Sequence, residues 1–89
     1  IKYYYVYVLH SSLDQQMYTG YTKDLQQRME QHQLGKVKST KNRRPLSMIY
    51  FEGCRNQSDA LRREKYLKSG SGKRYLKSRL KHFWNHPTG

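Results

Sequence analysis

The fold is decided by residues 3–10, Tyr-Tyr-Tyr-Val-Tyr-Val-Leu-His, whose aromatic and β-branched side chains are typical of a strand. Both alternating faces of this strand are apolar, so we expect other elements to cover it on both sides. Residues 11–14, Ser-Ser-Leu-Asp, indicate a turn. Residues 15–21 are then expected to return along the first strand as the second strand of a hairpin.

The register of this hairpin brings two tyrosines together. If the loop is residues 11–14, His10 faces Gln15 and Tyr7 faces Tyr18. The two tyrosines would then stand side by side on one face of the sheet. Such a pair can be packing alone, or it can line a site.

The next part of the chain changes from a helical to an extended pattern. Thr22 is expected to cap a helix that runs through residues 25–32 and stops at Gly35. Residues 36–45 are expected to form a basic loop or a short helix. Residues 46–52 alternate and follow a proline, which predicts a third strand.

The last part of the chain is helical. Ser58 is expected to cap a helix that ends at Ser69, a glycine-rich break follows, and residues 75–83 form the last helix. The order β-β-α-β-α-α predicts a small single α/β domain with a central three-stranded, mostly antiparallel sheet flanked by helices. We expect this domain to span residues 1–83 and residues 84–89 to form a C-terminal tail.

The charge of the chain indicates a polyanionic partner. Its 89 residues include 18 Lys and Arg against 6 Asp and Glu, which gives a formal net charge of +12. Nucleic acid is the polyanion that such a surface favours, although a solvated basic face or an anionic membrane surface are alternatives. We expect nucleic-acid contacts from seven of the cations: Lys23, Lys41, Arg43, Arg44, Arg63, Lys73 and Arg74.

Cysteine usage and hydropathy exclude other classes. Cys54 is the one cysteine, which excludes a disulfide within these 89 residues and a thiolate metal cluster. No apolar run approaches the roughly 20 residues of a membrane span. No signal sequence opens the chain, so we expect a cytoplasmic protein with no membrane partner.

Three charged or titratable residues fall where helices should be apolar. Arg28 and His32 share the inward face of the first helix, and Glu64 lies inside the apolar stripe of the second. Because an unpaired buried charge is costly, either Glu64 pairs with a basic residue such as Arg28, or it borders a ligand. A single carboxylate beside arginines fits a Mg²⁺ ligand that meets a phosphate. Tyr7, Tyr18 or His32 could orient or deprotonate a water molecule, and His32 could equally be a helix-end cation.

The combined pattern resembles the GIY-YIG endonuclease superfamily. Residues 5–7, Tyr-Val-Tyr, stand where that family has Gly-Ile-Tyr, and residues 18–20, Tyr-Thr-Gly, stand where it has Tyr-Ile-Gly. Arg28, His32 and Glu64 follow in the family's order. The run over residues 59–80 resembles small stand-alone bacterial members similar to the N-terminal catalytic domain of the excinuclease. The departures are Tyr5 in place of glycine, Thr19 in place of an aliphatic residue, and Tyr21 where some members have lysine; Lys23 could supply that cation.

The resemblance implies a nuclease domain that hydrolyses DNA phosphodiesters, as in repair or recombination. Glu64 would ligate one divalent cation, Mg²⁺ or Mn²⁺, and Arg28 would bind the phosphate. Tyr7 and Tyr18 would line the site, one of them helping to activate water, and His32 would serve in positioning or proton transfer. Gly20 would let the backbone pass close to its neighbours.

The expected partner is DNA, with no small-molecule cofactor, and a protein partner could supply targeting. Two alternatives use the same basic surface without turnover. The first is a non-catalytic nucleic-acid-binding module for DNA or structured RNA, and the second is a small RNA- or ribosome-associated protein.

Overall fold

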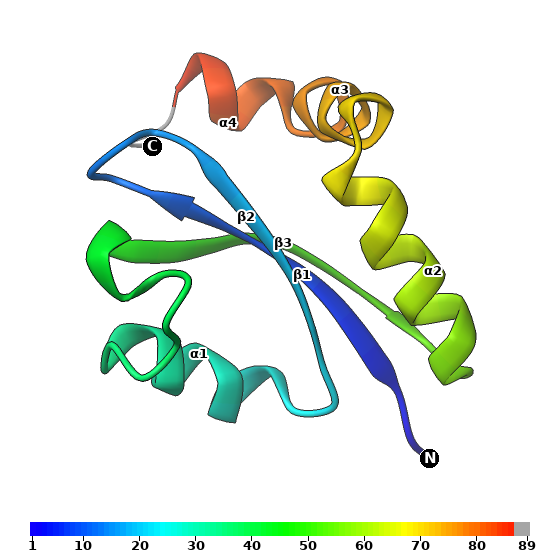
Figure 1. Cartoon of the computed structure of the whole chain (residues 1–89). Helices are drawn as coiled ribbons and strands as arrows, with labels where there is room; N and C mark the ends of the chain where they lie inside the picture. Colours follow the sequence, from blue (N-terminus) through cyan, green and yellow to red (C-terminus); the bar gives the residue numbers. More distant parts are fainter. Residues whose placement is uncertain (87–89) are drawn as a thin grey trace.

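A three-stranded sheet forms the centre of the domain in a computed structural model of the chain, which describes residues 1–86 (Figure 1). The strands are β1 (Tyr4–Ser11), β2 (Met17–Thr22) and β3 (Leu46–Cys54), in the order β2-β1-β3. Both pairings with the central strand β1 are antiparallel. The predicted α/β class and three-stranded sheet are therefore confirmed.

Helices flank the sheet on both faces (Figure 1). The first, α1 (Leu25–Gln33), lies on one side, and α2 (Gln57–Lys68) and α3 (Gly70–Arg79) lie on the other. A short 3-10 turn, η1 (Lys41–Arg43), precedes β3, and α4 (Lys81–Asn85) follows α3. Within residues 1–86, no helix is long and apolar enough to span a membrane.

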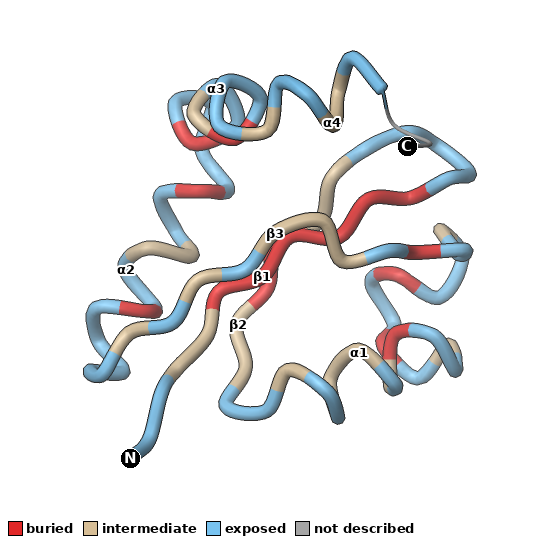
Figure 2. Tube along the Cα trace, turned by 180° about the vertical axis from the view of Figure 1, so that it is seen from behind, coloured by how far each residue is buried: buried red, intermediate tan, exposed pale blue. Residues whose placement is uncertain are grey.

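The core is built on both faces of β1 (Figure 2). Val6 and Val8 pack against α2 and α3 and are 0% exposed. Tyr7 and Leu9 point to the opposite face, toward α1, and are 1% and 0% exposed. The expectation that this strand is covered on both sides is confirmed, and it explains why neither set of alternating residues is polar.

The predicted hairpin register is wrong by two residues. Tyr7 pairs with Gly20, and Leu9 rather than Tyr7 pairs with Tyr18. The turn is longer than residues 11–14, because Ser11 N–H donates to Gln16 O at 3.0 Å. Tyr7 and Tyr18 nevertheless share one face, since Gly20 and Tyr18 are two residues apart along β2.

The helix caps differ from those predicted. Asp24, not Thr22, caps α1, because its side chain accepts a hydrogen bond from the N–H of Gln27. Asn56, not Ser58, caps α2 by accepting from two N–H groups of its first turn. Both caps lie within two residues of the predicted position, and in both cases a carboxylate or amide oxygen replaces a hydroxyl.

The C-terminal part is more helical than predicted. The glycines at positions 70 and 72 do not break the chain, because Ser69 caps α3 by accepting from the N–H of Gly72. The expected tail at residues 84–89 is also wrong at its start, since α4 continues to Asn85. Trp84 packs edge-on against His10, with ring centroids 5.6 Å apart, and this contact attaches α4 to β1. Residues 87–89 of the expected tail lie outside the described residues.

Candidate active site

Tyr7 is held at the centre of the domain by the absence of a side chain opposite it. Gly20 is its partner on β2, and the Tyr7 ring lies directly over that glycine. A Cβ at position 20 would lie 2.4 Å from both the Cζ and the hydroxyl oxygen of Tyr7. Gly20 thus permits the close approach that the sequence predicted, and the group that approaches is the Tyr7 ring.

The Tyr7 hydroxyl joins two side chains of α1. Its oxygen lies 2.8 Å from His32 Nε2, and Arg28 Nε donates to it at 3.3 Å. Arg28 also donates from Nη1 to Gln31 Oε1 at 2.9 Å. Positions 28 and 32 are one helical turn apart, so α1 presents both groups to the same point of β1.

His32 is enclosed by aromatic rings. It is 0% exposed, and its ring meets Tyr7 and Tyr18 edge-on at centroid distances of 5.6 Å and 5.4 Å. Its Nδ1 lies 2.7 Å from Thr40 Oγ1. Burial, helped by the charge of Arg28, lowers the pKa of His32 to about 4. The imidazole is therefore neutral at pH 7, which excludes the helix-end cation considered from the sequence.

Tyr7 is a neutral phenol in this setting. Burial raises the pKa of its hydroxyl, and the hydrogen bond and charge of Arg28 act in the opposite direction. Tyr18 and Glu64 also raise this pKa through their charges, so both lie near enough to Tyr7 to act on it. The carboxylate of α2 thus belongs to the same electrostatic environment as the tyrosine of β1.

Glu64 does not pair with Arg28. Its carboxylate forms an ion pair at 3.1 Å with Lys68, one turn later on α2, and its side chain is 20% exposed. Arg28 instead uses two of its nitrogens on Tyr7 and Gln31. The structural Arg28–Glu64 ion pair that the sequence left open is therefore wrong.

The donor set near Glu64 fits a magnesium-type ion rather than a protein-enclosed one. Among residues 1–86, no three His, Cys, Asp or Glu side chains are grouped so as to hold a metal. Mg²⁺ commonly takes one or two carboxylates and fills its octahedron with water and phosphate oxygens. A lone, partly exposed carboxylate such as Glu64 is sufficient for that mode.

The loop between α1 and β3 supplies two site residues that the sequence did not indicate. Ser39 donates its hydroxyl to Tyr18 Oη at 3.3 Å, and Thr40 contacts His32. Thr40 is 0% exposed, although it lies in a stretch that reads as a basic loop. The adjacent hydroxyls of a loop were the available signal, because loops carry many functional side chains.

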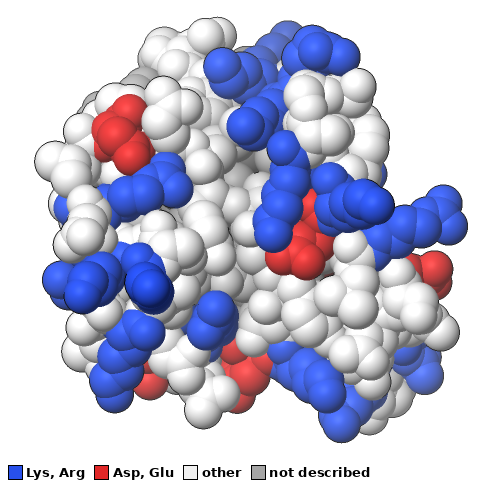
Figure 3. Space-filling model, viewed as in Figure 1, with Lys and Arg blue, Asp and Glu red and all other residues white. Residues whose placement is uncertain are grey.

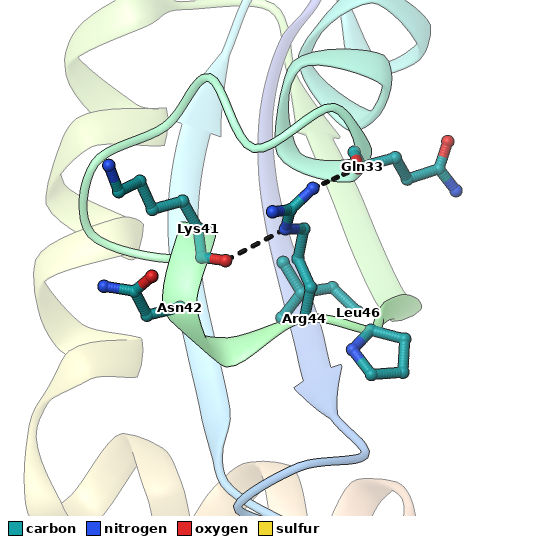
Figure 4. A pocket seen from close by; sticks show the side chains of 6 residues that line it. Gln33, Lys41, Asn42, Arg44 and Leu46 are labelled. Atoms are coloured by element: carbon teal, nitrogen blue, oxygen red, sulfur yellow. Dashed lines mark hydrogen bonds between the residues drawn. The ribbon is translucent and has the colours of Figure 1, made fainter.

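Three of the predicted nucleic-acid contacts are engaged inside the protein. Arg43 Nε forms an ion pair with Asp14 at 2.8 Å, and this pairing lowers the pKa of Asp14 to about 2. Arg63 Nε forms an ion pair with Glu52 at 2.6 Å and lies over two tyrosine rings. Arg44 borders a pocket of about 500 Å³ and donates to the backbone oxygens of Lys41 and Gln33 (Figure 4). These contacts give the three arginines a structural role, and their contact with nucleic acid stays a prediction.

The other predicted contacts are exposed. Lys23, Lys41, Lys73 and Arg74 lie on the surface. Lys73 and Lys68 line a hollow of about 280 Å³ beside Tyr18. On the face seen in Figure 3, Lys and Arg side chains far outnumber Asp and Glu. A polyanion approaching the two tyrosines would therefore meet cations from α2 and α3.

The fold and site together define a class: a small α/β domain that sets two tyrosines, an arginine, a histidine and a glutamate around one buried strand. The chain belongs to the GIY-YIG catalytic domain family, whose sequence model matches residues 3–79. It is 42% identical over 77 residues to a UPF0213 protein of Pediococcus acidilactici, covering 83% of this chain and 78% of that protein. A UPF0213 protein of Haloquadratum walsbyi is 41% identical over 68 residues, covering 75% of each chain.

A solved structure agrees with this assignment. The NMR structure of a UPF0213 protein from Bacillus halodurans superposes with a TM-score of 0.58 at 31% identity, covering 97% of this chain and 94% of that one. The family resemblance and the fold expected from the sequence are thus both confirmed.

Proposed function

We propose that this protein is a divalent-metal-dependent DNA endonuclease, acting in a setting such as DNA repair or recombination. The observation that carries the proposal is the hydrogen-bonded group of Tyr7, Arg28 and His32, which lies within electrostatic reach of Glu64 on the opposite helical layer. A merely structural tyrosine would not need a buried histidine and an arginine on its hydroxyl. The family assignment supports a nuclease domain.

Arg28 and Glu64 are the proposed contacts to the scissile phosphodiester. Arg28 keeps N–H groups on Nη1 and Nη2 that can donate to phosphate oxygens, because Tyr7 takes Nε and Gln31 takes one hydrogen of Nη1. Glu64 would hold Mg²⁺ or Mn²⁺, which when bound polarises the phosphate and stabilises the leaving oxygen.

The tyrosines are the proposed neighbours of the attacking water. Tyr7 Oη is fixed by two side chains of α1, so it can hold a water molecule in a defined direction. Tyr18 is held by Ser39 and by the edge of the His32 ring. Tyr7 is the better placed of the two for proton transfer, because Arg28 lies on its oxygen and stabilises negative charge there.

A second candidate is a nucleic-acid-binding module without turnover, which the net charge of +12 favours. Affinity does not separate the two, because both predict binding that weakens steeply with salt. Turnover that needs both a divalent cation and Glu64 separates them.

The test is the nicking of supercoiled plasmid by the wild type and Glu64→Gln, each with Mg²⁺, with Mn²⁺ and with EDTA. The matched control is Glu30→Gln, which removes an exposed acid from α1. We expect metal-dependent nicking by the wild type and the control, and none by Glu64→Gln. Equal nicking by all three proteins would overturn the role of Glu64. Tight plasmid binding without nicking would favour the binding module.

A further inference from the structure

Thr40 is a buried residue whose side-chain hydroxyl is reserved for the site. Its backbone groups are already used, since its N–H donates to Val37 O at 3.1 Å and its C=O accepts from Arg43 N–H at 2.9 Å. Its Oγ1 lies 2.7 Å from His32 Nδ1. Thr40 is 0% exposed, so this contact is shielded from competing solvent.

The hydrogens of this contact can be assigned by accounting for every buried donor. A neutral imidazole has one N–H and one bare nitrogen that accepts. If Nδ1 carried the hydrogen, it would donate to Thr40, and the Thr40 hydroxyl would need a second partner to accept its own hydrogen. Within residues 1–86 this hydroxyl has no partner other than His32. A buried hydroxyl hydrogen without an acceptor is unfavourable.

The opposite assignment pairs both groups. If Nε2 carries the hydrogen, Thr40 donates to the bare Nδ1, and His32 donates from Nε2 to Tyr7 Oη. The hydrogen left over is that of the Tyr7 hydroxyl. Tyr7 lies beside Arg28 and within the field of Glu64, where a bound substrate can accept it.

We propose that Thr40 is a positioning residue that holds His32 with its hydrogen on Nε2, so that this N–H donates to the Tyr7 oxygen. The proposal rests on the proposed function in taking Tyr7 as part of the reacting centre. Arg28 and His32 then both donate to one oxygen, which stabilises negative charge on it when its proton leaves. His32 cannot accept that proton on Nε2, so its role is to position Tyr7 and not to transfer a proton.

The test is NMR of the ring nitrogens of His32 in the whole chain, combined with plasmid nicking. Three proteins are compared: the wild type, Thr40→Val, which keeps the shape without the hydroxyl, and Thr40→Ser, which keeps the hydroxyl. We expect a protonated Nε2 and a hydrogen-bonded, bare Nδ1 in the wild type and in Thr40→Ser. In Thr40→Val the Nδ1 signal should move to that of a nitrogen without a partner, and nicking should fall roughly tenfold, as for one lost hydrogen bond.

Each result decides the matter. A hydrogen on Nδ1 of the wild type overturns the proposal, and so do unchanged ring signals and unchanged nicking in Thr40→Val. If Thr40→Val does not fold, the wild-type and Thr40→Ser signals still give the position of the hydrogen. If the wild type does not nick any substrate, the proposed function fails, whereas the ring nitrogens still test the role of Thr40.

Discussion

Replacing Gly20 with alanine tests how tightly the fold holds Tyr7. The new Cβ would lie 2.4 Å from Tyr7 Cζ, whereas ordinary contact begins at 3.4 Å, so the ring must move by about 1 Å. That movement breaks the 2.8 Å contact between Tyr7 Oη and His32 Nε2. Overpacking and a lost buried hydrogen bond together should lower the free energy of unfolding by about 2 kcal/mol, or Tm by roughly 8–16 °C.

The assay is thermal unfolding followed by plasmid nicking, with Gly53→Ala as the matched control. A Cβ at Gly53 in β3 would lie 3.2 Å from Cε1 of the half-buried Tyr5 ring, which can shift by the few tenths of an ångström required. We expect the control to keep wild-type stability and nicking, and Gly20→Ala to lose about 100-fold in nicking, because a reacting group is displaced. Wild-type Tm and nicking in Gly20→Ala would refute this account of the site.

Two further predictions concern the α1 side chains. His32 has a pKa of about 4 when folded against 6.5 when unfolded, so the unfolded chain binds the proton first as the pH falls. The free energy of unfolding should therefore drop by about 3 kcal/mol between pH 6.5 and pH 4 in urea titrations. His32→Asn should lack this part of the slope, and an identical slope in both proteins would contradict the buried neutral imidazole. Arg28→Ala should abolish nicking yet change plasmid affinity only about threefold, because many of the 18 cations contribute to binding; a collapse of affinity in a filter-binding assay would make Arg28 mainly a binding residue.

The sequence predicted the parts of the fold that depend on local pattern. β1 was predictable because apolar residues on both alternating faces are typical of a central strand. The site residues of α1 were predictable because Arg28 and His32 are polar on a face that should be apolar. Both signals come from spacing along one element, and spacing is what a sequence displays directly.

The hairpin register and Thr40 depend on information of another kind. The turn contains Gln15 at a φ of 61°, a left-handed conformation that glutamine does not signal, so its length was underestimated. Thr40 reaches His32 because the loop after α1 folds back onto it, a tertiary contact that no periodicity encodes. The engaged arginines were missed for the same reason. A sequence does not distinguish Arg63, paired with Glu52, from a cation that faces solvent.

The two halves of the site differ in how firmly folding fixes them. Tyr7 and His32 lie in the core and are joined by a buried hydrogen bond, so they cannot rearrange without disturbing the packing of β1. Glu64 lies on the surface side of α2 and is held by Lys68, whose side chain is 55% exposed. An exposed pair at this spacing contributes only about 0.3–0.5 kcal/mol, so Lys68 can release the carboxylate at little cost. The hydrogen-bonded half is therefore set by folding, whereas the carboxylate half stays free to adjust to what binds beside it.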